Sequence, residues 1–88
     1  MELEQLRDFV ALAETGSFSA AARRLYKSHS SVSRAVSALE RELGVALCER
    51  DRHRFALTGA GRTLHAGARE LLAGLDALER RVRESDGE

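Results

Sequence analysis

The chain has 88 residues, of which 43% are hydrophobic, with no proline, no tryptophan and a single cysteine. This length allows about one small domain, the hydrophobic content argues against disorder, and the composition favours helices over a β-sandwich rich in turns. The 14 basic and 14 acidic side chains cancel, yet residues 21–54 hold eight basic against four acidic side chains. A basic patch is therefore expected in the middle third of a neutral chain.

Three further protein classes are excluded by the same composition. No run is long and apolar enough to span a membrane, and the acidic, amphipathic start MELEQLRDFV is unlike a signal peptide. The lone Cys48 rules out an internal disulfide and fits a reducing cytosol. We therefore expect a cytoplasmic protein without a membrane partner.

Two helices are predicted in the first 25 residues. Apolar residues at helical spacing predict a helix over residues 2–14, which Gly16 ends. Ser17 or Ser19 can cap a second, short helix. The apolar side of that helix consists of Phe18, Ala21, Ala22 and Leu25.

A third helix follows a turn made by residues 26–28. Ser28 is placed to cap this helix, which runs to about Leu43 and ends at Gly44. Its buried stripe is Val32, Val36, Leu39 and Leu43, and its opposite face carries Ser30, Ser33, Arg34, Ser37 and Arg41. Two helices joined by a three-residue turn, with alanines where they cross, indicate a helix-turn-helix.

The serines on the third helix fit a recognition helix. A helix that sits deep in the major groove needs outer residues that are short or form hydrogen bonds. Ser30, Ser33 and Ser37 keep that face slim, and Arg34 can reach a base or a phosphate. The alternative is a plain solvated helix face.

Residues 45–58 contain two short apolar stretches around a polar tip, which predicts a β-hairpin. Leu47 and Cys48 lead into the tip at residues 51–54, and Phe55 and Leu57 lead out of it. The basic side chains gathered there are Arg50, Arg52, His53 and Arg54. Such a hairpin is typical of a wing that contacts the DNA backbone or the minor groove, and the alternative is a basic surface loop. Arg50 lies in the strand, where it could instead pair with an acid.

The last helix is predicted over residues 59–84, with Thr58 as its cap. Apolar residues alternate by four and three along it, which is the seam of a coiled coil: Leu64, Ala68, Leu71, Leu75, Leu78 and Val82. Gly67 and Gly74 flank the seam and suggest that another backbone passes close by. The first turns are expected to pack on the chain's own domain. The last three extend beyond it, so a partner helix is expected there, and packing on its own domain alone is the alternative.

The elements together predict a mainly α fold, a winged helix-turn-helix of three helices plus a small β-hairpin wing, followed by a long linker helix. The expected division is a DNA-binding domain over residues 1–58 and a linker and dimerisation helix over residues 59–88. Cys48, His53 and His65 lack zinc-ligand spacing, and no Ser–His–Asp group or phosphate loop is present. We expect no enzyme, cofactor or metal, His65 on the surface, and Cys48 as a core residue, with a redox-sensing thiol as the alternative.

The sequence resembles the N-terminal DNA-binding domain of the LysR-type transcriptional regulators over nearly its whole length. The motifs that carry the resemblance are MELEQLRDFVALAETGSFSAAARRL at the start, SHSSVSR at 28–34, LERELGVALCER at 39–50 and LTGAG at 57–61. The resemblance implies a bacterial regulator that binds double-stranded DNA as a dimer, or as a tetramer at full length, through paired linker helices. It also implies an effector-binding domain, which is absent here, so we expect a truncated piece of a longer regulator.

This sequence departs from the family pattern at a few positions. His29 and Ser30 stand where the family usually has Gln followed by Pro or Ser, so the base preference there is expected to differ, because Gln can pair with adenine in a way that His cannot. Lys27 replaces a usual apolar residue, and Cys48 replaces a common Phe.

The predicted DNA contacts are Lys27, Ser28, His29, Ser30, Ser31, Ser33, Arg34, Ser37, Arg50, Arg52, His53 and Arg54. The predicted dimer contacts are Leu64, Ala68, Leu71, Leu75, Leu78 and Val82. A helical interaction module without a DNA role is the second function class. The basic wing and the serine-rich helix face argue against it, because neither helps a contact between proteins.

Overall fold

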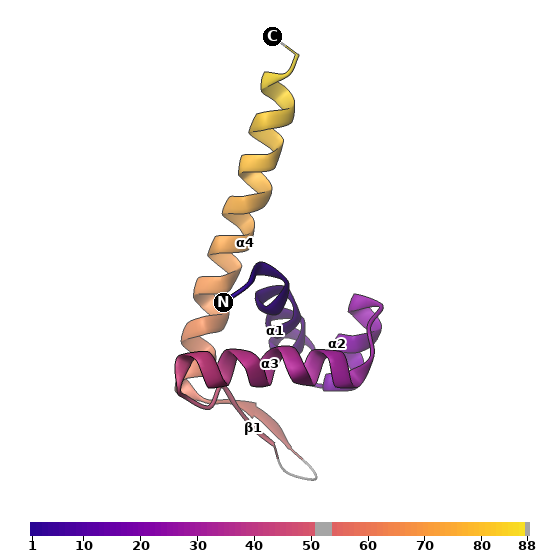
Figure 1. Ribbon diagram of the computed structural model, residues 1–88, viewed down its shortest axis with the longest axis vertical. Helices are drawn as coiled ribbons and strands as arrows, with labels where there is room; N and C mark the ends of the chain where they lie inside the picture. The colour runs from indigo at the N-terminus through magenta and orange to yellow at the C-terminus, as the bar shows by residue number, and fades with distance from the viewer. Residues whose placement is uncertain (51–53, 88) are drawn as a thin grey trace.

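The computed structural model describes residues 1–50 and 54–87 as a winged helix-turn-helix with a long final helix (Figure 1). Its elements, in chain order, are α1 (Leu3–Thr15), α2 (Phe18–Leu25), α3 (His29–Leu43), β1 (Cys48–Arg50), β2 (Phe55–Leu57) and α4 (Gly59–Ser85). The predicted mainly α fold, three helices and a small hairpin followed by a long helix, is confirmed. The predicted helix ends lie within one residue of the observed ones.

Side-chain caps explain where three of the helices begin. The hydroxyl of Ser28 accepts a hydrogen bond from the backbone N–H of Ser31 at the start of α3, and Thr58 caps α4 in the same way. Of the two candidates for α2, the structure uses Ser17. A short oxygen side chain at this position satisfies one of the N–H groups that a helix start leaves without a partner.

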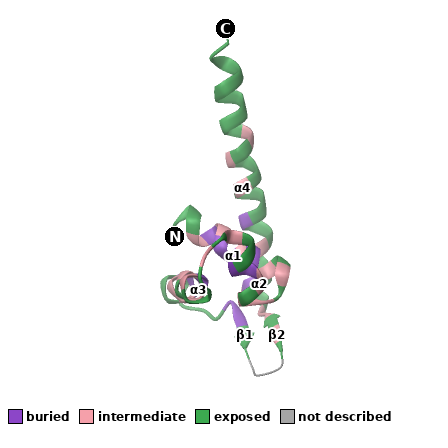
Figure 2. Ribbon diagram, turned by 90° about the vertical axis from the view of Figure 1, so that its right-hand side faces the viewer, coloured by how far each residue is buried: buried purple, intermediate pink, exposed green. Residues whose placement is uncertain are grey.

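The core lies where α1, α2 and α3 meet and is closed by the segment that leads into β1 (Figure 2). Its largest fully buried side chains are Phe9, Leu12, Val32, Val36, Leu39 and Leu47. Cys48 is buried at its edge, as expected. Leu43, predicted to end the buried stripe of α3, is 40% exposed instead, because the last turn of the helix runs past the core before Gly44 ends it.

The hairpin is held between the core and the start of α4. β1 and β2 pair antiparallel, with Cys48 opposite Leu57. The backbone N–H of Thr58 donates to the carbonyl of Leu47 at 3.0 Å. A Cβ atom on Gly61 would lie 2.0 Å from that same carbonyl oxygen, so only glycine allows α4 to approach this closely.

The final helix leaves the domain after its first turns and projects away from it (Figure 1). Its 27 residues span about 40 Å in a molecule that measures 55 × 26 × 18 Å. Ala68 is its last buried residue, and the turns beyond it are largely exposed (Figure 2). Along the described ranges, no helix combines the length and the apolar character that a membrane crossing requires.

Candidate nucleic-acid interface

The outer face of α3 is fixed by three inward valine and leucine side chains. Val32, Val36 and Leu39 are fully buried, and their helical spacing turns the opposite side of α3 outward. On that side Ser30 and Arg34 are exposed, whereas the other two serines, Ser33 and Ser37, are half-buried. The result is a narrow surface of hydroxyl groups around one guanidinium.

The serines at the start of α3 also serve the helix itself. The Ser28 hydroxyl accepts from the N–H of Ser31 at 3.1 Å and lies 3.2 Å from the hydroxyl of Ser30. Ser28 and Ser30 are exposed and Ser31 is half-buried. Ser28 is therefore first of all a helix cap, and a DNA contact through its hydroxyl would come in addition to that role.

In the turn before α3, Lys27 has two partners within the chain. Its ammonium donates to the buried carboxylate of Asp8 at 2.9 Å and also bonds Glu4, both on α1. Two hydrogen bonds raise the pKa of Lys27, of which the bond to Glu4 has the larger effect and the bond to Asp8 the smaller. The bond between Lys27 and Glu4 also lowers the pKa of Glu4. Lys27 is predicted as a DNA contact. In the structure its ammonium pairs with the buried carboxylate of Asp8, which is only 2% exposed and needs a partner, so a DNA contact would come in addition to that role.

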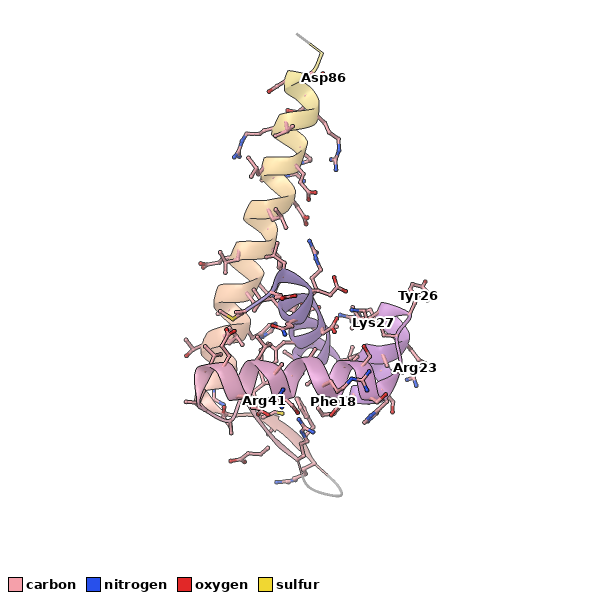
Figure 3. The ribbon with its side chains drawn as sticks, viewed as in Figure 1. Phe18, Arg23, Tyr26, Lys27, Arg41 and Asp86 are labelled. Atoms are coloured by element: carbon pink, nitrogen blue, oxygen red, sulfur yellow. The ribbon has the colours of Figure 1, made fainter. Side chains whose placement is uncertain are left out.

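Tyr26, the residue before Lys27, points its side chain into solvent. It ends α2 in the left-handed backbone region, at φ 57°, and its side chain is 97% exposed. Figure 3 shows the ring projecting from the end of α2. This residue closes the turn by its backbone, and its side chain contributes nothing to the core.

The hairpin contributes basic side chains of two kinds. The guanidinium of Arg50 lies 3.9 Å from the carboxylate of Glu40 on α3, so the acid partner suggested by the sequence exists. Arg54 is exposed. Arg52 and His53, also predicted as contacts, lie outside the described residues.

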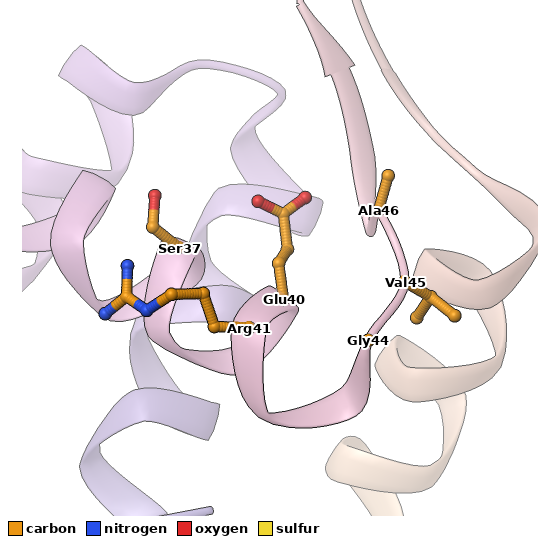
Figure 4. Close-up of a pocket in the computed structure, with 6 residues that line it drawn as sticks. All are labelled: Ser37, Glu40, Arg41, Gly44, Val45 and Ala46. Carbon is orange, nitrogen blue, oxygen red and sulfur yellow. The ribbon is translucent and has the colours of Figure 1, made fainter.

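A shallow depression marks the junction between the end of α3 and the hairpin (Figure 4). It is lined by Ser37, Glu40, Arg41, Gly44, Val45 and Ala46. Glu40 accepts a hydrogen bond from the N–H of Leu47 at 2.8 Å, which ties the hairpin to α3. Arg41 is exposed and was left out of the predicted contacts, although its spacing of four from Ser37 and seven from Arg34 already placed it on the same face.

The predicted seam on α4 divides into two parts. Ala68 is 1% exposed and Leu64 packs against the core, so these two residues belong to the chain's own domain and not to a free seam. Leu71, Leu78 and Val82 are 48–62% exposed, and Leu75 is half-buried.

An apolar groove runs along the free part of the seam. Its lining comes from α4 and from the start of α1: Leu3, Gly67, Glu70, Leu71, Gly74, Leu75 and Leu78. A Cβ atom on Gly67 or Gly74 would meet nothing within 4 Å. No backbone in the described part of this chain therefore explains the two glycines.

No metal-binding arrangement occurs in the ranges that the structure covers, 1–50 and 54–87, where no cluster of three or more His, Cys, Asp or Glu side chains was found. His65, expected on the surface, is half-buried. Its Nε2 atom is buried without a hydrogen-bond partner among the described residues.

Comparison with known proteins identifies one family. The family described as "Bacterial regulatory helix-turn-helix protein, lysR family" matches this chain over residues 3–62. The HTH-type transcriptional regulator ClcR of Pseudomonas putida is 50% identical over 72 residues, which cover 82% of this chain and 24% of that protein. The chain thus spans about a quarter of the length of this relative.

Solved structures that resemble the chain include protein–DNA complexes. The CbnR_DBD–DNA complex matches with a TM-score of 0.91 and 40% identity, over 97% of this chain and 98% of the other. The complex of BenM_DBD with catB site 1 DNA matches with a TM-score of 0.96 and 34% identity, over 100% of this chain and 99% of the other.

Proposed function

The chain belongs to the lysR family of bacterial regulatory helix-turn-helix proteins, and we propose that it reads double-stranded DNA with α3 in the major groove. Its fold and its relatives are those of DNA-binding domains of transcriptional regulators and not of enzymes. The observation that carries the proposal is the exposed face of α3, where short hydroxyls surround Arg34 beside a basic hairpin.

The shape of α3 suits the major groove. That groove is about 12 Å wide and admits one α-helix, so bulky side chains on the outer face would hold the backbone away from the bases. The proposed base contacts are His29, Ser30, Ser33, Arg34 and Ser37. Arg41, one turn beyond Ser37, is exposed near the end of the helix and is proposed to meet a phosphate.

The hairpin is proposed to contact the DNA backbone or the adjacent minor groove. Arg54, the one tip residue that the structure describes, is exposed, and Arg52 and His53 are assigned from the sequence. Arg50 has partners inside the chain and is given a smaller share of this contact. A cation on a wing neutralises phosphate charge whatever the sequence of the DNA.

Dimerisation is proposed through the free part of α4. Leu71, Leu75, Leu78 and Val82 form an apolar stripe that the domain does not cover, and Gly67 and Gly74 leave room beside it for a second backbone. Family resemblance supports an antiparallel pairing, which would set two α3 helices along one face of the DNA.

The complete regulator is proposed to be longer than this chain. The match to this chain covers only 24% of the length of ClcR, so that relative extends well beyond the shared part. We assign residues 1–58 to the winged domain and residues 59–88 to the linker helix, followed in the full protein by an effector-binding domain that allows tetramers. We propose that the regulator works in the bacterial cytoplasm, on the nucleoid, because that is where its proposed DNA partner lies.

A salt titration tests the DNA-binding proposal. Fluorescence anisotropy with a labelled random-sequence duplex of about three helical turns should show affinity that falls linearly with salt on a log–log scale, by about 0.9 in slope for each neutralised phosphate. Replacing Arg80 and Arg81 by alanine removes two exposed charges from the far end of α4 and should leave the slope unchanged. Failure to bind at the lowest salt, or binding that salt does not weaken, would contradict the proposal.

A further inference from the structure

Phe18, the first residue of α2, is the meeting point of side chains from three other elements. Its ring centroid lies 5.3 Å from that of His29, with the two planes tilted by 40°. The ring of Phe55 meets it edge-on at 6.1 Å. The guanidinium carbon of Arg50 lies 4.5 Å from the centroid of the Phe18 ring.

The partners of Phe18 come from the two parts that are proposed to touch DNA. His29 is the exposed first residue of α3, whereas Arg50 ends β1 and pairs with Phe55 of β2 in the hairpin register. Phe18 itself is half-buried and packs against the core. In Figure 3 it lies beneath α3, on the side of the hairpin.

We propose that Phe18 is a positioning residue that holds the imidazole of His29 and the guanidinium of Arg50 in a fixed relation, and so couples base reading at the start of α3 to the position of the hairpin. This inference rests on the proposed function, because it concerns how that function is divided between α3 and the wing. Phe18 acts through its neighbours and is not itself a DNA contact.

The contacts around the ring are of kinds that restrict orientation. Aromatic rings attract one another in tilted and edge-on geometries, and a guanidinium is drawn to the face of a ring. Arg50 is held from a second side by Glu40 at 3.9 Å. The other carboxylate oxygen of Glu40 accepts the N–H of Leu47, so the hairpin strand and its arginine are fixed together.

Orientation matters for His29 because an imidazole has two distinct nitrogens. In the neutral ring one nitrogen donates and the other accepts, so the direction of the ring decides which base edge it fits. An exposed side chain that is held in place before binding also loses less freedom when the complex forms. The base preference at the start of α3 should therefore depend on Phe18, which reaches no base.

The first arm of the test uses the free chain. In proton NMR we expect a nuclear Overhauser effect between the Phe18 ring and the ring protons of His29. Phe18→Leu should shift the His29 ring signals and the Arg50 Nε–H signal, and Phe18→Tyr, which keeps the ring, should restore them. Absence of the Overhauser effect in the unmodified chain would overturn the proposal, even if Phe18→Leu failed to fold.

The second arm measures base preference with duplexes selected by the unmodified chain from a random pool. Phe18→Leu should lower the ratio of specific to random affinity about threefold to tenfold, mainly at the base pair whose preference His29→Gln alters. In a His29→Ala background the same change should have little further effect on that base pair, because interacting residues are not additive. Equal losses on specific and random DNA would overturn the proposal.

Leu25→Val is the matched control for this arm. It changes another half-buried residue of α2 that packs against the same core, but keeps the ring that contacts His29. It should leave the base preference in place. An equal change in base preference by Leu25→Val and Phe18→Leu would mean that loss of packing alone is responsible. If the unmodified chain selects no sequence, the proposed function fails, while the NMR arm still decides whether Phe18 holds its two partners.

Discussion

Arg34 is the charged side chain at the centre of the exposed face of α3, between serines one turn to either side. A guanidinium in that place can donate two parallel hydrogen bonds to the edge of a guanine. Serines are too short to compete with it for the same base pair. Arg34 is therefore the strongest candidate for sequence reading in this domain.

Replacing Arg34 by alanine should weaken binding to a selected duplex by about 1–3 kcal/mol and narrow the gap to random DNA. Competition titrations with both duplexes give the two affinities. Arg80→Ala, which removes an exposed arginine from the distal part of α4, is the control and should change neither. Equal losses on both duplexes would identify Arg34 as a phosphate contact.

The charge of Lys27 stabilises the fold by pairing with a buried carboxylate. Its ammonium neutralises Asp8, whose side chain is 3% exposed, and so joins the turn before α3 to α1. Lys27→Met should lower the free energy of unfolding by about 1–3 kcal/mol, since it leaves a buried carboxylate without its partner. Urea unfolding followed by circular dichroism measures this change. The double variant Lys27→Met with Asp8→Leu should recover much of the loss.

The loss caused by Lys27→Met should also depend on pH. The pKa of Glu4 is lowered from its ordinary 4.5, so its bond stabilises above that value and is lost as the pH falls through the folded pKa. The pKa of Lys27 is raised from 10.5, so its contribution is present below that value and is lost as the pH rises through the folded pKa. The difference between variant and parent should be constant between these limits and shrink on either side. A difference that stays the same at all pH values would show that the ion pairs do not stabilise the fold.

Among the elements, the hairpin connects α3 to α4 and is bonded to the start or end of each. Glu40 on α3 accepts the N–H of Leu47 before β1, and the carbonyl of Leu47 accepts the N–H of Thr58 after β2. The base of the hairpin thus has fixed points on both helices.

Neutralising Arg52 and Arg54 together, by substitution with glutamine, should weaken binding to every sequence alike. The slope of log affinity against log salt should flatten by about one to two units, since each lost phosphate contact removes about 0.9. Arg50→Gln should change the slope less, because its guanidinium is engaged by Glu40 and Phe18. An unchanged slope in the double variant would remove the hairpin from the interface.

Local features of this fold can be read from the sequence, whereas contacts between distant residues cannot. The caps Ser28 and Thr58 and the terminator Gly44 act within a few residues, and they place the ends of α3 and the start of α4 correctly. The bond between Lys27 and Asp8 joins residues 19 apart, and no periodicity signals it.

In the candidate interface too, local features can be predicted from the sequence and contacts between distant residues cannot. The exposed face of α3 follows from helical spacing, so Ser30 and Arg34 lie where the sequence placed them. The ring contact between Phe18 and His29 depends on how α2 crosses α3. Gly61 was also missed, because its need for close approach appears only once α4 is packed against Leu47.

The winged domain and the projecting part of α4 differ in how much of their apolar surface the chain itself covers. The core is shared by α1, α2, α3 and the first turns of α4, which end at Ala68. Beyond Ala68 the seam residues have few neighbours in this chain, although they are as apolar as the core. A single chain therefore leaves an apolar stripe in water, which a second copy can cover.

Light scattering on the chain at micromolar concentration should give twice the 9.7 kDa mass of one chain. Leu71→Glu or Leu75→Glu should give monomers that still fold, because an unpaired charge in the seam is costly to bury only in the dimer. Ala73→Glu, a change at an exposed residue on the opposite side of α4, should leave the dimer intact. A parent chain that remains monomeric at high concentration would place the dimer contacts elsewhere.

Selection of bound duplexes from a random pool shows whether two α3 helices read sequence together. We expect an enriched palindromic sequence, with half-sites separated by about one helical turn or a multiple of it, and weaker enrichment with the Arg34→Ala variant. A pool that remains random after repeated selection, from a chain that is folded and dimeric, would contradict sequence reading by α3.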